Sequence, residues 1–89
     1  MDKNEIKKLL TEVRKLKSEP DHKYFLLLSD QTCIVGSNPM MIMKRFKREF
    51  KGKTIVDMYE TDKRINSGVT SLSKLIEYDP AHIRGLIES

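Results

Sequence analysis

The sequence predicts a small α+β domain in which a three-stranded sheet, containing a β-hairpin, is covered by helices. Two observations carry this prediction. Apolar residues recur at helical spacing in several segments, and two short apolar runs flank a cluster of three polar residues. The predicted order is α-β-β-α-β-α-α, and 89 residues leave room for one compact domain spanning 1–89.

The first predicted helix covers residues 3–17. Asp2 and Glu5 resemble a capping box at its start. Pro20 ends it, because proline has no backbone N–H to continue the hydrogen bonds of a helix. We expect this helix to pack on the sheet, with helix-mediated dimerisation as the alternative. Its apolar residues recur at i, i+3, i+4, i+7 and i+10, on one stripe of the helix: Ile6, Leu9, Leu10, Val13 and Leu16.

A β-hairpin is predicted next, because the apolar runs Tyr24–Leu28 and Thr32–Val35 flank the turn formers Ser29-Asp30-Gln31. The first run shows no alternation of polar and apolar residues. We therefore expect both faces of that strand to be covered. A third strand is predicted over residues 53–59.

The second predicted helix covers residues 39–50. Asn38 is its expected N-cap, Pro39 takes the first helical position, and Gly52 is the expected stop. Four of its apolar side chains fall within about 100° of one another and define a stripe that faces the core: Ile42, Met43, Phe46 and Phe50.

The last third of the chain predicts a loop followed by two short helices. The loop covers residues 60–68. The first helix is opened by Thr70 or Ser71. The second has Asp79 as its expected N-cap and Pro80 in the first helical position.

The charge is unevenly distributed along the chain. The net charge is +4 and the pI is about 9.3. Residues 1–53 carry 13 basic and 7 acidic side chains, whereas residues 54–89 carry 4 and 6. Cys33 is the only cysteine, so no intrachain disulfide can form, and the longest apolar run is too short to span a bilayer. We therefore expect a cytoplasmic protein without a membrane segment.

Residue patterns for catalysis and cofactor binding are weak. Cys33 lies in an apolar strand and fits a small buried hydrophobe better than a nucleophile paired with His22 or His82. The four glycines are too far apart for a phosphate-binding loop. We expect a protein that is not an enzyme, with no cofactor and no metal. The potential metal ligands lack a recognisable spacing: Asp21, His22, Glu60, Asp62, Asp79 and His82.

The strongest candidate for function is a run of cations from Lys44 to Lys53, which carries a net charge of +5 in ten positions, relieved only by Glu49. Two methionines, Met40 and Met41, are expected to be exposed on the same helix and to add adaptable apolar atoms to this charge. A charged helix face with no partner is the alternative. The predicted binding residues are Met40, Met41, Lys44, Arg45, Lys47, Arg48, Lys51 and Lys53.

These residues favour a small non-catalytic protein that contacts nucleic acid, or a complex that handles nucleic acid, through a basic helix containing methionine. The alternative is an inhibitor or adaptor, of the type encoded by phages and mobile elements, that binds a host protein complex through the same surface. A domain this small also gains stability from a partner or a second copy, so a homodimer is a further alternative.

Overall fold

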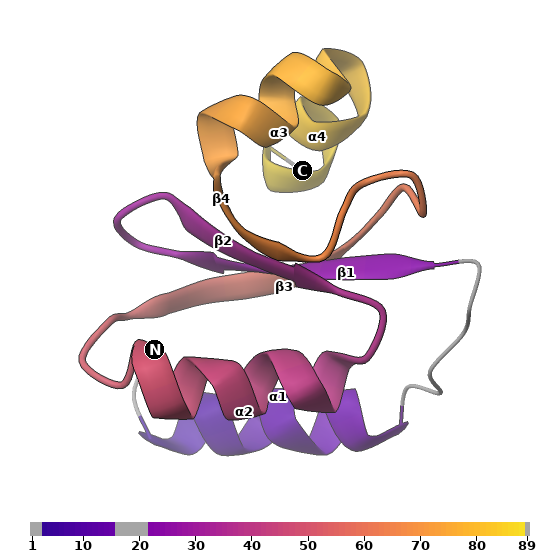
Figure 1. The fold of residues 1–89 in the computed structure, drawn as a ribbon. Helices are drawn as coiled ribbons and strands as arrows, with labels where there is room; N and C mark the ends of the chain where they lie inside the picture. The colour runs from indigo at the N-terminus through magenta and orange to yellow at the C-terminus, as the bar shows by residue number, and fades with distance from the viewer. Residues whose placement is uncertain (1–2, 16–21, 89) are drawn as a thin grey trace.

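The structure is a computed structural model that describes residues 3–15 and 22–88. The polypeptide forms three layers, with α1 and α2 on one face of a sheet and α3 and α4 on the other (Figure 1). The elements follow one another as α1 (Lys3–Lys15), β1 (Lys23–Leu28), β2 (Thr32–Gly36), α2 (Pro39–Glu49), β3 (Ile55–Thr61), β4 (Gly68–Ser71), α3 (Leu72–Tyr78) and α4 (Pro80–Glu88).

The predicted α+β class is confirmed, but the predicted three-stranded sheet is wrong. Four strands lie in the order β3-β1-β2-β4, and every neighbouring pair is antiparallel. The element order is therefore α-β-β-α-β-β-α-α. The missed strand, β4, contains one large apolar residue, Val69, so its sequence carries little of the pattern that marks a strand.

The β1–β2 hairpin forms the centre of the sheet. Phe25 pairs with Val35, and the turn is closed by the Gln31 N–H, which donates to the Leu28 carbonyl at 2.9 Å. Gln31 has a φ of 69°, the left-handed conformation that three-residue hairpin turns need at this position. The Asp30 carboxylate accepts from the Thr32 N–H at 3.0 Å and so holds the turn.

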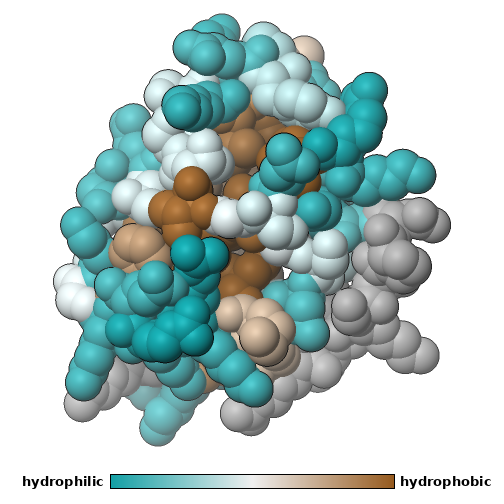
Figure 2. Space-filling model, in the orientation of Figure 1, coloured by the Kyte–Doolittle hydropathy of each residue, from teal (hydrophilic) through white to brown (hydrophobic). Residues whose placement is uncertain are grey.

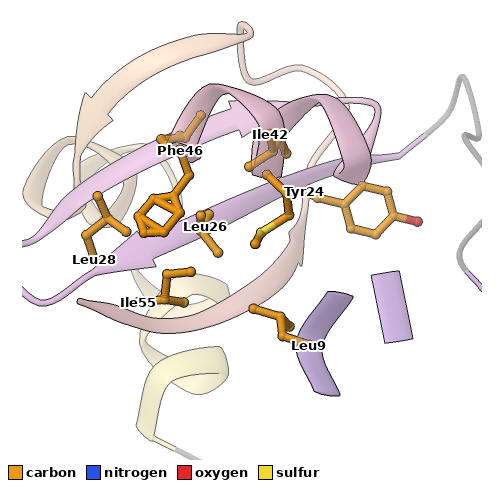
Figure 3. Close-up of a cluster of buried hydrophobic side chains, with 9 residues drawn as sticks. Leu9, Tyr24, Leu26, Leu28, Ile42, Phe46 and Ile55 are labelled. Atoms are coloured by element: carbon orange, nitrogen blue, oxygen red, sulfur yellow. The ribbon is translucent and has the colours of Figure 1, made fainter. Parts of the chain in front are cut away.

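The alternation of side chains along β1 divides the core into two clusters. Phe25 and Leu27 point to the layer of α3 and α4, where Phe25 stacks on Tyr59 with ring centroids 5.1 Å apart. Leu26 points to the layer of α1 and α2. Both faces of β1 are therefore buried, as its sequence predicted. Figure 3 shows the cluster on the α1 and α2 side, which comprises Leu9, Tyr24, Leu26, Leu28, Ile34, Ile42, Met43, Phe46 and Ile55.

The helix α2 begins as predicted and ends earlier than predicted. The Asn38 side chain accepts from the Met40 N–H at 3.0 Å, and Pro39 takes the first helical position. The helix stops at Glu49, and the Phe50 N–H, at the C-cap, donates to the Phe46 carbonyl at 2.8 Å. The helix thus ends one residue before the predicted end at residue 50, and Gly52 lies just beyond it, although Gly52 does not adopt the left-handed conformation typical of a glycine at a helix end.

The strand β4 leads directly into the C-terminal helices. Gly68 opens it with a φ of 142°, a conformation that residues with a Cβ rarely adopt. Ser71 ends it and also caps α3, since its hydroxyl accepts from the Lys74 N–H at 3.3 Å. Asp79 accepts from the His82 N–H at 3.3 Å and caps α4, as predicted.

The helix α1 agrees with the first predicted helix over the residues that the structure describes. Leu9 from the predicted apolar stripe is buried in the cluster beneath the sheet, and Leu10 packs against that cluster. The predicted cap at Asp2 and the predicted stop at Pro20 lie outside the described residues.

Candidate functional site

The predicted binding residues occupy several different environments on α2 and the loop that follows it. A helix places residues separated by three or four positions on the same side. Met41, Lys44 and Arg48 therefore share one side of α2, next to Arg45. Lys47 lies further round the helix, and the remaining cations follow the helix in the loop: Lys51 and Lys53.

The two methionines differ in exposure. Met41 is 57% exposed, as predicted. Met40 was expected to be exposed as well, but it is half-buried and packs against the hydrophobic cluster beneath the sheet. Met40 therefore lies on a side of α2 that the protein's own hydrophobic cluster partly covers. Met41 is thus the methionine available to a partner.

Two of the predicted arginines share one acidic partner. Glu49 accepts from the Arg45 Nε at 2.7 Å and from the Arg48 Nη2 at 3.2 Å. Hydrogen bonds from Arg48 and Arg45 hold the pKa of the Glu49 carboxyl below its usual value. These three residues carry one net positive charge, and their side chains hold one another in place on the surface.

Three lysines from the predicted set remain exposed and unpaired. Lys44, Lys47 and Lys51 make no ion pair with any residue that the structure describes. Lys53, by contrast, is paired with Asp30. The unpaired lysines are therefore the part of the predicted surface whose charge is free for a ligand.

A shallow groove lies between α2 and the sheet beside β4. It has a volume of about 510 Å³, with Ile34 and Ile42 among its apolar residues. Gly36 lets α2 approach this closely, because a Cβ there would lie 3.3 Å from the Ile42 Cγ1. Four of the predicted binding residues line the groove: Met41, Lys44, Arg45 and Arg48.

Figure 2 shows that apolar side chains gather between the two helical layers on the face of the molecule that presents α2. Hydrophilic side chains surround them on this face. Ser67 and Gly68 also line the groove, although the sequence did not predict them as site residues. The only signal for them was a glycine inside a polar segment, which marks a bend but does not indicate what lies beside it.

Cys33 is in the interior of the sheet. It is 0% exposed, and burial raises the pKa of its thiol to about 12, with a smaller contribution from the Asp30 carboxylate. A thiol in this state is a poor nucleophile. The prediction that Cys33 is a small buried hydrophobe is confirmed.

Five of the potential metal ligands line one hollow near the end of β3 and the start of α4. The interactions described for these side chains are with other residues of the protein. His22 pairs with Glu60, and Arg64 holds Asp62 through its Nη2 at 2.8 Å. Asp79 caps α4. Within residues 3–15 and 22–88, no three metal-ligating side chains are arranged to hold an ion. The ligands in this hollow are His22, Glu60, Asp62, Asp79 and His82.

The same described ranges contain no helix long and apolar enough to cross a membrane. Comparison of the chain with models of protein families, with curated proteins and with solved structures yields no match.

Proposed function

We propose that the chain is a non-catalytic binding protein that contacts the phosphate backbone of a nucleic acid through the cations of α2 and its following loop. The observation that carries this proposal is the exposure of Lys44, Lys47 and Lys51, which have no acidic partner within the described part of the chain. Cations that are not neutralised by the protein can displace counterions condensed on nucleic acid, and this release favours binding.

The arrangement supports contacts with the backbone rather than with bases. The aromatic side chains of this region are turned toward the core: Phe46 is buried and Phe50 is half-buried. They therefore offer no exposed ring on which a base could stack. With Arg48 included, about four phosphates can be contacted, so on duplex DNA log K should fall with log salt at a slope of about −3.6.

The test is fluorescence anisotropy of labelled duplex DNA, single-stranded DNA and RNA over a series of salt concentrations. Replacing Lys47 and Lys51 by Ala should reduce the slope by about two. The control pair Lys63→Ala and Arg84→Ala removes the same charge from exposed positions outside α2 and should leave the slope close to that of the parent protein. If none of the three probes shows salt-sensitive binding, the proposal is wrong.

A protein partner is the second candidate, and the groove beside Met41 favours it. Met41 is exposed and lines this groove, and a methionine side chain adapts its shape to the surface of a partner protein. In this case the chain acts as an inhibitor or adaptor that binds a host protein complex. Replacing Met41 by Ser should weaken a protein complex strongly and a phosphate-driven complex hardly at all. For both candidates we propose a cytoplasmic location. We also propose a homodimer, which the molar mass of the protein in solution would test.

A further inference from the structure

The outer edge of β4 offers a second surface, which shares Lys44 with the exposed lysines of α2 but not Lys47 or Lys51. β4 pairs with β2 on one side, and it is the last strand in the order β3-β1-β2-β4. The backbone groups on the other side of such a strand are free to pair with another chain. Val69 on this strand is 44% exposed.

The register shows which backbone groups of β4 point outward. Thr32 pairs with Ser71, and the next N–H along the chain, that of Leu72, donates to the Gln31 carbonyl at 2.9 Å. This bond lies beyond the Thr32–Ser71 pair, so Thr32 and Ser71 form a non-hydrogen-bonded pair. The alternation of an antiparallel ladder then directs the N–H and C=O of Thr70 to β2, and those of Val69 away from it.

Two hollows flank this edge, one on each side of the sheet. The groove beside α2 has a volume of about 510 Å³, and a second hollow, beside α3, has a volume of about 410 Å³. Gly68 contributes to both. Among the described residues, neither lining includes a carboxylate. The cations that line them are Lys44, Arg45, Arg48, Arg64 and Lys74.

The opposite edge of the sheet has the reverse charge. Two hollows next to β3 have acids as all but one of their charged lining residues, with Lys8 as their one described cation. An acidic chain is repelled from the β3 edge and attracted to the β4 edge, so charge selects between the two open edges. The acids of these hollows are Glu5, Glu12, Asp57 and Glu60.

We propose that the β4 edge binds an extended, acidic segment of a partner protein, which adds to the sheet as a fifth strand. The outward N–H and C=O of Val69 supply main-chain hydrogen bonds, and alternate side chains of the segment enter the two hollows. Carboxylates of the segment meet Lys44 and Lys74, which have no ion pair among residues 22–88. This inference goes beyond the contact with nucleic acid, because it uses a strand edge and a different class of ligand.

The probe for the test is a fluorescein-labelled synthetic peptide of repeating Glu-Glu-Val-Val with blocked termini. Successive side chains of a strand point to opposite faces, so this pattern presents carboxylates to both hollows. Amide hydrogen exchange by NMR is measured with peptide at up to about 1 mM, a range that covers weak complexes. The Val69 amide should exchange rapidly in the free protein and at least about tenfold more slowly in the complex. The Thr70 amide, already bonded to β2, should change little. A peptide with Lys in place of Glu should not bind.

Variants at Val69 separate strand addition from simple charge attraction. Val69→Pro removes the outward N–H without breaking a bond to β2, and proline is tolerated on strand edges of this kind. It should abolish peptide binding while leaving the binding of nucleic acid unchanged. The matched control, Val69→Thr, keeps the N–H and the branched shape and should bind the peptide as the parent protein does.

Several outcomes would overturn the inference. Peptide binding without slower exchange at Val69 would show that the edge is not paired, and this readout on the parent protein stands even if Val69→Pro fails to fold. Equal binding of the Lys peptide would remove the role of the cations. Protection of Val69 that grows with protein concentration alone would assign the edge to a second copy, and protection by DNA or RNA would assign it to nucleic acid. Replacing Lys47 and Lys51 by Ala tests the proposed function separately, because neither residue lines the two hollows.

Discussion

The Lys53 Nζ lies 2.7 Å from the Asp30 Oδ2 and joins two segments that are 23 residues apart in the chain. Asp30 is in the turn of the β1–β2 hairpin, and Lys53 is in the loop between α2 and β3. The Ser29 N–H donates to the Thr54 carbonyl at 2.9 Å beside this pair. Lys53, which was predicted to contact a ligand, therefore already has a partner within the chain.

The Lys53–Asp30 pair predicts a specific dependence of stability on pH. The hydrogen bond from Lys53, with further bonds from Thr32, lowers the pKa of the Asp30 carboxyl from 3.8 to about 2. A carboxyl with a lowered pKa stabilises the fold above its unfolded pKa, and this contribution is lost as the pH falls toward the folded value. Lys53→Met should therefore be less stable than the parent protein at neutral pH, and the difference should shrink between pH 4 and pH 2.

Two measurements check this prediction. Urea denaturation over a series of pH values gives the free energy of unfolding, and NMR titration of the Asp30 carboxyl gives its pKa, which should rise in Lys53→Met. The control is Lys51→Met, which removes an exposed lysine that has no ion pair with the described residues. An equal rise in the Asp30 pKa in both variants would contradict the assignment to Lys53.

The two methionines of α2 should respond differently to replacement by Ser. Met40 packs against the core, so Met40→Ser should lower the free energy of unfolding by about 1–3 kcal/mol. Met41 is exposed, and Met41→Ser should change it by less than about 0.5 kcal/mol. Chemical denaturation of both variants provides the comparison. Equal losses of stability would show that Met41 also supports the fold, and Met41→Ser would then no longer be a clean test for a protein partner.

Cys33 should be unreactive in the folded protein. Burial raises the pKa of its thiol to about 12, so the reactive thiolate is scarce at pH 8. The thiol should react with an aromatic disulfide reagent only as fast as the sheet opens, and stoichiometrically once the protein is unfolded in guanidinium. Rapid reaction of the folded protein at pH 8 would be incompatible with the buried position. Cys33→Ser should destabilise the fold by about 1–3 kcal/mol, because it places a hydroxyl in an apolar site.

Thr61, the last residue of β3, should be a stabilising position. Its side chain is buried, and its Oγ1 has no hydrogen-bond partner among the described residues. Thr61→Val keeps the branched shape and removes the unsatisfied oxygen, so it should stabilise the protein by about 1 kcal/mol. Thr61→Ser keeps the hydroxyl and loses a methyl group, and it should be destabilising. Differential scanning calorimetry of the two variants decides the point, and a lower Tm for Thr61→Val would reveal a partner for the hydroxyl.

Local signals in the sequence predicted the helices well. Asn38 and Pro39 mark the start of α2, and Asp79 and Pro80 mark the start of α4, because capping and the fixed φ of proline depend on residues next to one another. The end of α2 was less predictable. The spacing of Phe50 would continue the core stripe, but its backbone is no longer helical, with a φ of −129° and a ψ of 24°.

The binding surface could be predicted only in part. The sequence showed that cations and methionines are concentrated between residues 40 and 53, but it could not show that Lys53 would meet Asp30 or that Met40 would pack on the core. Which cations share an acid and which remain free depends on the fold around them. The surface therefore reduces to Met41 and three unpaired lysines, with Arg45 and Arg48 held by Glu49.

The sequence by itself determined the α+β class, the hairpin, the helix starts and the buried state of Cys33, because each depends on the polarity and conformational preference of neighbouring residues. Only the tertiary structure decided that β4 exists and that cations gather at its edge. A strand with a single large apolar residue forms because β2 offers an unpaired row of backbone donors and acceptors. The cations meet there because α2 and α3 pack on opposite faces of one sheet.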